Sequence, residues 1–216
     1  MDEHLTIHQQ PRGGFSVSRT IDYYLAPQSP WTYLGHTRLV AMAQGAAAEV
    51  RVRPVDLGRV FPVSGGLPLG KRAPQRQAYR LLELRRFADH LAIPLNLEPR
   101  YFPVAGDDAA RLIIAARQAQ GSESALRLAG AVLAAVWEQE RNIADPLVLQ
   151  QLLQEQGLPA QLVKEAVSGD VQKEYDDNTA AAIAVGVFGA PTYCVDGEMF
   201  WGQDRLEFLA RRLARN

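Results

Sequence analysis

The chain has 216 residues, of which 47% are hydrophobic and 22% are charged, and its formal net charge is -1. This balance argues against a basic nucleic-acid-binding protein, and no apolar run reaches the roughly 18 residues of a membrane helix. The amino-terminal segment lacks the apolar core of a signal peptide, so we expect a cytoplasmic protein. The single cysteine, Cys194, excludes an internal disulfide, a dithiol redox pair and a cysteine-based zinc site.

Residues 1–18 show no hydrophobic period and contain one proline and two glycines, so we expect a flexible extension. His4 and His8 lie in this segment, and we interpret them as part of a polar tail rather than as metal ligands.

A strand, a helix and a second strand are predicted next. Alternating apolar residues predict a strand that starts at Thr20. The turn Pro27-Gln28-Ser29-Pro30 leads into a predicted helix over residues 31–47, and alternation resumes over residues 50–55. This βαβ order indicates parallel pairing of the two strands.

The middle of the chain is predicted to be a long loop followed by helices. Residues 58–75 contain four glycines and three prolines, which predicts the loop. The spacing of Leu84, Phe87 and Leu91 predicts a helix that ends at Pro94. Further helices are predicted over residues 108–119, 123–141, 146–156, 159–168 and 171–185.

Strand signals return near the carboxyl end. Residues 192–195 and 198–201 read as a hairpin around Asp196-Gly197, and a helix follows from Leu206. The whole order predicts an α/β protein with a thioredoxin fold and an all-helical domain inserted after the second strand. We assign residues 19–57 and 171–216 to the thioredoxin-like domain and residues 58–170 to the helical insertion.

The first chemical candidate is Ser29, at the strand-to-helix turn. Ser29 and Thr32 stand where a thioredoxin fold carries its Cys-x-x-Cys dithiol. A serine hydroxyl cannot exchange disulfides, but it can donate a hydrogen bond to a thiolate that a ligand supplies. The helix N-terminus adds a partial positive charge there. From spacing alone, a simple helix cap is the favoured explanation of Ser29.

Two later segments also leave alternatives open. Pro191 begins a strand, and its peptide bond with Ala190 is either cis or trans. If it is cis, we expect the N–H and C=O of Ala190 to be free to pair with an extended peptide. Asp204 opens the last helix and either caps that helix or receives a ligand ammonium or amide group.

The remaining polar candidates favour structural roles. Cys194 lies inside a strand, where a lone cysteine is more typical of a small core residue. His36 and His90 have no second ligand at metal-binding spacing. The cluster of Arg51, Arg53 and Arg59 indicates a solvated face, with an anion site as the alternative.

Three segments, residues 22–35, 186–193 and 196–206, together resemble the 2-hydroxychromene-2-carboxylate isomerase family. That family is related to kappa-class glutathione transferases and to DsbA-like thioredoxin folds. The resemblance covers about residues 20–213, and the run Phe-Trp-Gly-Gln-Asp-Arg at positions 200–205 is its most specific part.

The resemblance implies a glutathione-dependent homodimer that acts on a small molecule, without nucleic-acid or membrane partners. It assigns the glutathione thiolate to Ser29 and the cysteinyl backbone to Ala190, before a cis Pro191. The glutathione-binding residues that it implies are Ser29, Arg59, Arg76, Asn178, Ala190, Pro191, Trp201, Gly202, Gln203 and Asp204.

The implied reaction is cis–trans isomerisation, with Ser29 as the catalytic residue and glutathione as a regenerated cofactor. The thiolate adds reversibly to a conjugated, aromatic-derived substrate. Two alternatives remain: a kappa-like transferase that conjugates electrophiles, and a non-catalytic thioredoxin-fold binding module. A disulfide oxidoreductase would require an exposed Cys194 that acts alone.

Overall fold

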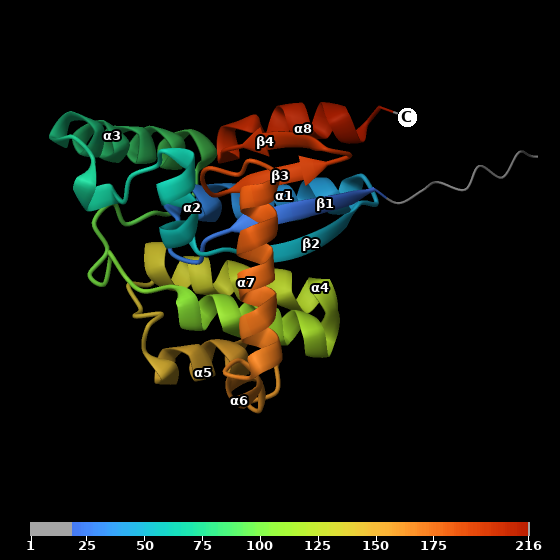
Figure 1. The fold of residues 1–216 in the computed structure, drawn as a ribbon. Helices are drawn as coiled ribbons and strands as arrows, with labels where there is room; N and C mark the ends of the chain where they lie inside the picture. Colours follow the sequence, from blue (N-terminus) through green and yellow to red (C-terminus); the bar gives the residue numbers. More distant parts are fainter. Residues whose placement is uncertain (1–18, 216) are drawn as a thin grey trace, which may run out of the picture.

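A computed structural model describes residues 19–215, which form a four-stranded sheet covered by helices (Figure 1). The expectations for residues 1–18, including those for His4 and His8, lie outside the described residues. No helix within residues 19–215 is both long enough and apolar enough to cross a membrane.

The first strand of the chain is one of the two inner strands of the sheet. Its strands are β1 (Thr20–Leu25), β2 (Glu49–Pro54), β3 (Thr192–Val195) and β4 (Glu198–Trp201). In the order β2-β1-β3-β4, β1 runs parallel to β2, as the sequence predicted, and antiparallel to β3. Tyr24 lies opposite Thr192, so β1 ends close to the point where β3 begins. The β3–β4 hairpin turns at Asp196 and Gly197, both with positive φ, as predicted.

Helices cover both faces of this sheet. They are α1 (Pro30–Gly45), α2 (Leu57–Ser64), α3 (Pro74–Leu91), α4 (Asp107–Trp137), α5 (Pro146–Glu155), α6 (Leu162–Glu165), α7 (Gly169–Ala184) and α8 (Leu206–Leu213). Short 3-10 turns occupy Leu69–Lys71 and Gln203–Arg205. In Figure 1, α7 crosses in front of the sheet while α1 lies behind it. The predicted α/β thioredoxin fold with a helical insertion is confirmed, and the domain boundaries stay a prediction.

The two faces carry separate hydrophobic clusters. Tyr23 and Leu25 point into the main cluster, which includes Leu39 of α1 and much of α4. Tyr24 points the other way, into a smaller cluster with Ala182 at the end of α7. This alternation is the period of two that a strand covered on both faces requires.

The predicted loop over residues 58–75 is wrong for its first part, because only residues 65–73, with a short 3-10 turn, connect the helices. Residues 57–64 form α2, in which the Asp56 carboxylate accepts a hydrogen bond of 2.7 Å from the Gly58 N–H. Pro62 inside this helix lacks an N–H and removes one backbone bond. The Asp56 cap and the burial of Val60 offset that loss.

The other helices of the insertion lie close to their predicted ranges. α4 joins the helices predicted over residues 108–119 and 123–141, and the chain reverses at Gly121, with φ 84° and ψ 174°. The two halves therefore run side by side, and both outer ends of α4 lie on one side of the molecule (Figure 1). The helix predicted over residues 159–168 is shorter, because only Leu162–Glu165 is helical.

His36 joins α1 to both the sheet and α4. Its Nδ1 lies 3.2 Å from the Tyr23 hydroxyl, and its Nε2 lies 3.0 Å from the carbonyl oxygen of Leu126. The expected structural role of His36 is thereby confirmed. Burial lowers its pKa to about 4, although the bond to Leu126 opposes this shift.

We expect this histidine to make the unfolding free energy depend on pH. Its pKa is 6.5 when unfolded and about 4 when folded, so its contribution is present above pH 6.5 and is lost as the pH falls toward 4. The loss amounts to about 2 kcal/mol at pH 5. Urea denaturation at pH 7 and pH 5 measures it, with His36→Gln as the comparison. An equal pH-dependent loss in the two proteins would contradict this assignment.

Candidate functional site

Ser29 lies at the amino end of α1, after the turn that follows β1. Its hydroxyl oxygen accepts a hydrogen bond of 3.2 Å from the Thr32 N–H, which confirms the helix-cap interpretation. The same hydroxyl donates a bond of 3.3 Å to the carbonyl oxygen of Ala190. Pro30 fits the first helical position because its missing N–H has no partner there in any helix. Ser29 is buried, so its hydroxyl is shielded from bulk water.

The loop before β3 meets Ser29 directly. The peptide bond between Ala190 and Pro191 is cis, one of the two alternatives that the sequence left open. The carbonyl of Ala190 is not free, contrary to expectation, because it accepts the Ser29 hydroxyl. The Gly202 N–H donates a bond of 2.9 Å to the Pro191 carbonyl, which ties this loop to the end of β4.

The segment that ends β4 lies against this loop. Trp201 is half-exposed, and its ring lies 4.7 Å from that of Phe188. A Cβ at Gly189 would lie 2.6 Å from the Trp201 Nε1, so a larger residue here would displace the Trp201 ring. Gln203 is buried, and its Oε1 accepts a bond of 2.8 Å from Arg38.

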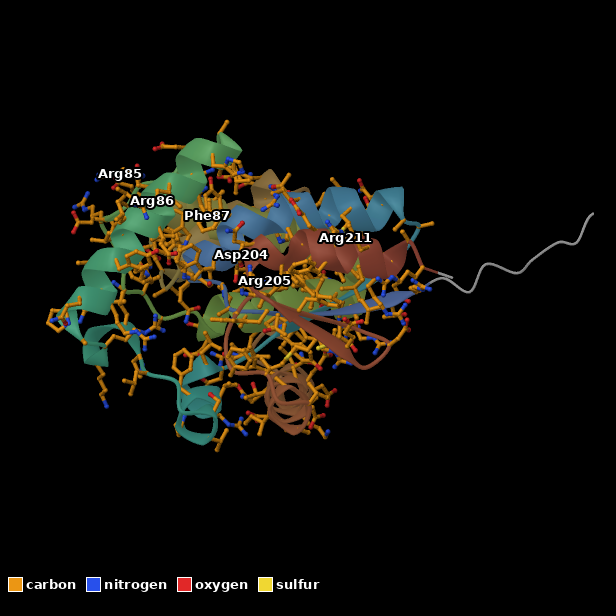
Figure 2. All side chains as sticks on the ribbon, turned by 90° about the horizontal axis from the view of Figure 1, so that it is seen from above. Arg85, Arg86, Phe87, Asp204, Arg205 and Arg211 are labelled. Atoms are coloured by element: carbon orange, nitrogen blue, oxygen red, sulfur yellow. The ribbon has the colours of Figure 1, made fainter. Side chains whose placement is uncertain are left out.

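Asp204 does not cap the last helix. Its carboxylate pairs with the adjacent Arg205 at 2.6 Å, and α8 has no side-chain cap (Figure 2). The capping alternative for Asp204 is therefore wrong. Asp204 is exposed beside Gly202, whose φ of 102° suits glycine.

Three other predicted residues do not contact this cluster. Arg59 pairs with Asp176 at 2.5 Å, and Asn178 accepts a bond of 3.0 Å from Arg53. Arg76 is exposed on α3. No hydrogen bond within residues 19–215 joins any of the three to Ser29, so their place in the site stays a prediction.

The basic cluster at β2 is only partly neutralised. Arg51 and Arg53 share one carboxylate, that of Asp22, at 3.2 Å and 2.7 Å. Arg59 has its own acidic partner, and the anion site that was the alternative for this cluster stays a prediction.

Cys194 is half-buried on β3. Burial, together with the charge of Asp22, raises the pKa of its thiol to about 11. Such a thiol is almost wholly protonated near neutral pH, which argues against an oxidoreductase that works through Cys194 alone.

Two residues beside Ser29 were missed as site candidates. Gln28 Oε1 and Thr32 Oγ1 are buried and have no hydrogen-bond partner within residues 19–215. Buried polar atoms are rarely left unpaired, so both indicate a place where a ligand can bind. Their position next to the Ser29 turn is the signal that could have found them.

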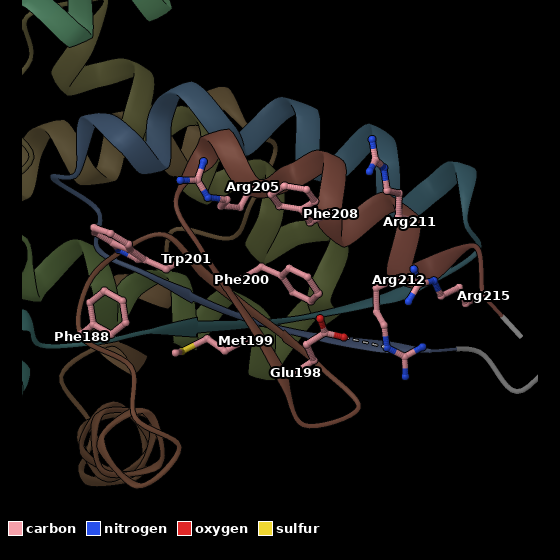
Figure 3. A pocket seen from close by; sticks show the side chains of 10 residues that line it. All are labelled: Phe188, Glu198, Met199, Phe200, Trp201, Arg205, Phe208, Arg211, Arg212 and Arg215. Atoms are coloured by element: carbon pink, nitrogen blue, oxygen red, sulfur yellow. Dashed lines mark ion pairs between the residues drawn. The ribbon is translucent and has the colours of Figure 1, made fainter.

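A separate groove of about 550 Å³ runs along β4 and α8 (Figure 3). Phe188 and Trp201 lie at one end, and Arg212 and Arg215 lie at the other. Arg212 is paired with Asp196 and Glu198. The groove borders the Trp201 segment, but Ser29 does not line it.

Comparison with known proteins identifies relatives of this chain. The family model of the DsbA-like thioredoxin domain matches residues 20–214. A 2-hydroxychromene-2-carboxylate isomerase of Pseudomonas putida is 31% identical over 208 residues, covering 90% of this chain and 94% of that protein. One from Sphingobium xenophagum is 29% identical over 195 residues, covering 89% and 97%.

Solved structures give the same picture of the fold. A 2-hydroxychromene-2-carboxylate isomerase structure has a TM-score of 0.77 at 28% identity, covering 91% of this chain and 95% of that one. The cytosolic disulfide reductase DsbM from Pseudomonas aeruginosa, solved with GSH, has a TM-score of 0.64 at 19% identity, covering 89% and 93%. At that identity the likeness is one of fold alone.

We expect Ser29→Ala to lower the unfolding free energy by about 1 kcal/mol, because the Thr32 N–H loses its cap. Ser29→Gly should cost only a few tenths of a kcal/mol, since glycine is tolerated at this position. Chemical denaturation of the three proteins measures both losses. Equal stability of the alanine variant and the parent would show that the cap contributes nothing.

Proposed function

Because this chain belongs to the 2-hydroxychromene-2-carboxylate isomerase family, with a DsbA-like thioredoxin domain, we propose that it is a glutathione-dependent isomerase whose Ser29 stabilises a thiolate. The relatives are named as isomerases, and the chain is an enzyme of that family. The observation that carries the proposal is the buried Ser29 hydroxyl, which stands at a helix N-terminus and donates only to the Ala190 carbonyl.

Unpaired buried atoms support a fit to glutathione. Besides Gln28 and Thr32, the Nε2 of Gln203 has no hydrogen-bond partner within residues 19–215. In the proposed complex Ser29 holds the thiolate and the Ala190 backbone holds the cysteinyl unit. The γ-glutamyl end is held by Trp201, Gly202, Gln203 and Asp204, and further contacts come from Pro191, Arg59, Arg76 and Asn178.

The electrostatics of α1 favour an anion at Ser29. The first turn of α1 contains no acidic residue, so nothing offsets the partial positive charge of the helix N-terminus. A free thiol has a pKa of roughly 8.5, and lowering it by about 2 units requires roughly 2.7 kcal/mol. When the hydroxyl exchanges a neutral carbonyl for a thiolate, a long bond is replaced by a charge-assisted one.

Bound glutathione supplies a thiolate that can add reversibly to a conjugated double bond and so allow rotation about it. Ser29 holds that sulfur deprotonated, and the buried setting of its hydroxyl keeps water from competing for the same hydrogen bond. In the proposed complex, Asp204, which is exposed beside the end of β4, receives the ammonium group of glutathione. The substrate in this proposal is a conjugated, aromatic-derived small molecule, and the active form is a cytoplasmic homodimer.

We expect glutathione bound to the parent protein to have a thiolate pKa about 2 units below that of free glutathione. Ser29→Ala and Ser29→Gly should both raise that pKa toward the free value, because both lack the hydroxyl. Calorimetry gives the binding, and ultraviolet absorbance of the thiolate followed against pH gives the pKa. The two variants differ in how well they cap α1, and so in stability. An equal rise of the thiolate pKa in both therefore shows that the rise comes from the missing hydroxyl and not from a loss of stability.

Other outcomes of that experiment would point elsewhere. The absence of glutathione binding to the parent protein would overturn the proposal and leave a thioredoxin-fold binding module. Binding with a lowered pKa, followed by accumulation of a stable conjugate with electrophiles, would identify a kappa-like transferase.

Asp204→Asn should weaken glutathione binding by roughly tenfold, because a charge-assisted bond to the ammonium group is lost. The thiolate pKa should not change, since Ser29 is untouched. Glu207→Gln is the matched control: Glu207 is an exposed acid in the first turn of α8, three residues after Asp204, and forms no ion pair within residues 19–215. If the two variants weaken binding equally, a direct contact by Asp204 is excluded.

A further inference from the structure

Residues 71–91 carry an excess of positive charge. The basic residues are Lys71, Arg72, Arg76, Arg80, Arg85 and Arg86, and the acidic ones are Glu83 and Asp89. None of these six bases forms an ion pair with any of residues 19–215. The arginines of β2 and α2 differ, because each has an acidic partner. This segment therefore holds positive charge that an anionic ligand can use.

Arg80 is the member of this group that turns inward. It lies on the same face of α3 as Leu84 and Phe87, at the spacing i, i+4 and i+7. Leu84 is fully buried, and the Phe87 ring lies 6.0 Å from that of Trp31 in the first turn of α1. Figure 2 shows Phe87 on the side of α3 that faces α1 and Arg85 on the opposite side.

The Arg80 guanidinium contacts aromatic rings and no acid. It lies 5.3 Å from the centroid of Phe102 and 5.7 Å from that of Trp137. It donates no hydrogen bond to any group in the described part of the chain, although a guanidinium carries five N–H donors. Burial, together with the nearby charge of Arg72, lowers its pKa to about 10. An anion placed here would pair these donors and offset the repulsion between the two arginines.

Arg80 and Ser29 lie on the same side of the molecule. The segment from Phe102 to Gly106 leads into α4, and at Gly106 its backbone packs so closely on Gln28 that a Cβ would clash with that side chain. Gln28 precedes Ser29 in the chain. The amino end of α1 is thus flanked by α3 through Trp31 and by the Phe102–Gly106 segment through Gln28.

We propose that Arg80, assisted by Arg72, is the group that binds the carboxylate of the electrophilic substrate. This inference rests on the proposed function. The half-buried Phe102 ring beside Arg80 offers an apolar surface to an aromatic acid, while the guanidinium offers a planar, bidentate partner to its carboxylate. Arg76, one turn before Arg80 on α3, keeps its proposed role in binding glutathione.

The test compares an acid with its neutral ester. Trans-cinnamate and methyl cinnamate serve as probes, titrated by calorimetry into the full chain with saturating glutathione. We expect Arg80→Met to weaken cinnamate binding about tenfold or more and to leave methyl cinnamate and glutathione binding within about twofold. Arg80→Lys should restore part of the loss, because it keeps the charge without the bidentate geometry.

Arg85→Met is the matched control, since Arg85 is exposed on the same helix and lies on its opposite side. Arg72→Met provides a second, independent variant if Arg80→Met does not fold, and a selective loss of cinnamate binding is expected there too. Equal loss of the acid and the ester, or a loss confined to glutathione, would overturn the assignment. A parent protein that binds cinnamate through Arg80 but not glutathione would support the anion site and contradict the isomerase proposal.

Discussion

The antiparallel pairing of β1 with β3 is the constraint on which the site depends. Tyr24 lies opposite Thr192, so the turn after β1 and the loop before β3 meet at one edge of the sheet. Ser29 and Ala190 are 161 positions apart in the chain, yet this register brings their polar atoms within hydrogen-bond distance. The β3–β4 hairpin brings a third segment to the same edge of the sheet, because Trp201 lies opposite Thr192.

Electrostatics divide the molecule into neutralised and unneutralised regions. On the sheet face, Arg51 and Arg53 share the carboxylate of Asp22, which joins β2 to β1 and offsets part of their positive charge. At the amino end of α1 the situation is reversed, since the helix begins without an acidic residue. The neighbouring α3 adds arginines that have no ion pair within the described chain. A protein with a net charge near zero can therefore still have a positive potential at one place, where it attracts anions.

The scaffold is that of thiol–disulfide chemistry, but its residues do not permit that chemistry. Ser29 and Thr32 occupy the two positions at which a dithiol would stand, and the half-buried Cys194 has a pKa that disfavours the thiolate. The helix N-terminus that would stabilise a protein thiolate is still present. In the proposed function it stabilises a thiolate that another molecule supplies, so the same fold serves a different chemistry.

The sequence by itself determined the local elements, because periodicity and capping act over a few residues. The βαβ unit, the Asp196-Gly197 hairpin and the cap at Ser29 followed from patterns of that length. The proline and glycine content of residues 58–75 was misleading, since the burial of Val60 depends on contacts made far along the chain. Only the tertiary structure decided that Ser29 meets Ala190. It also decided which basic side chains find an acidic partner, because strand register and helix packing join residues that no local pattern relates.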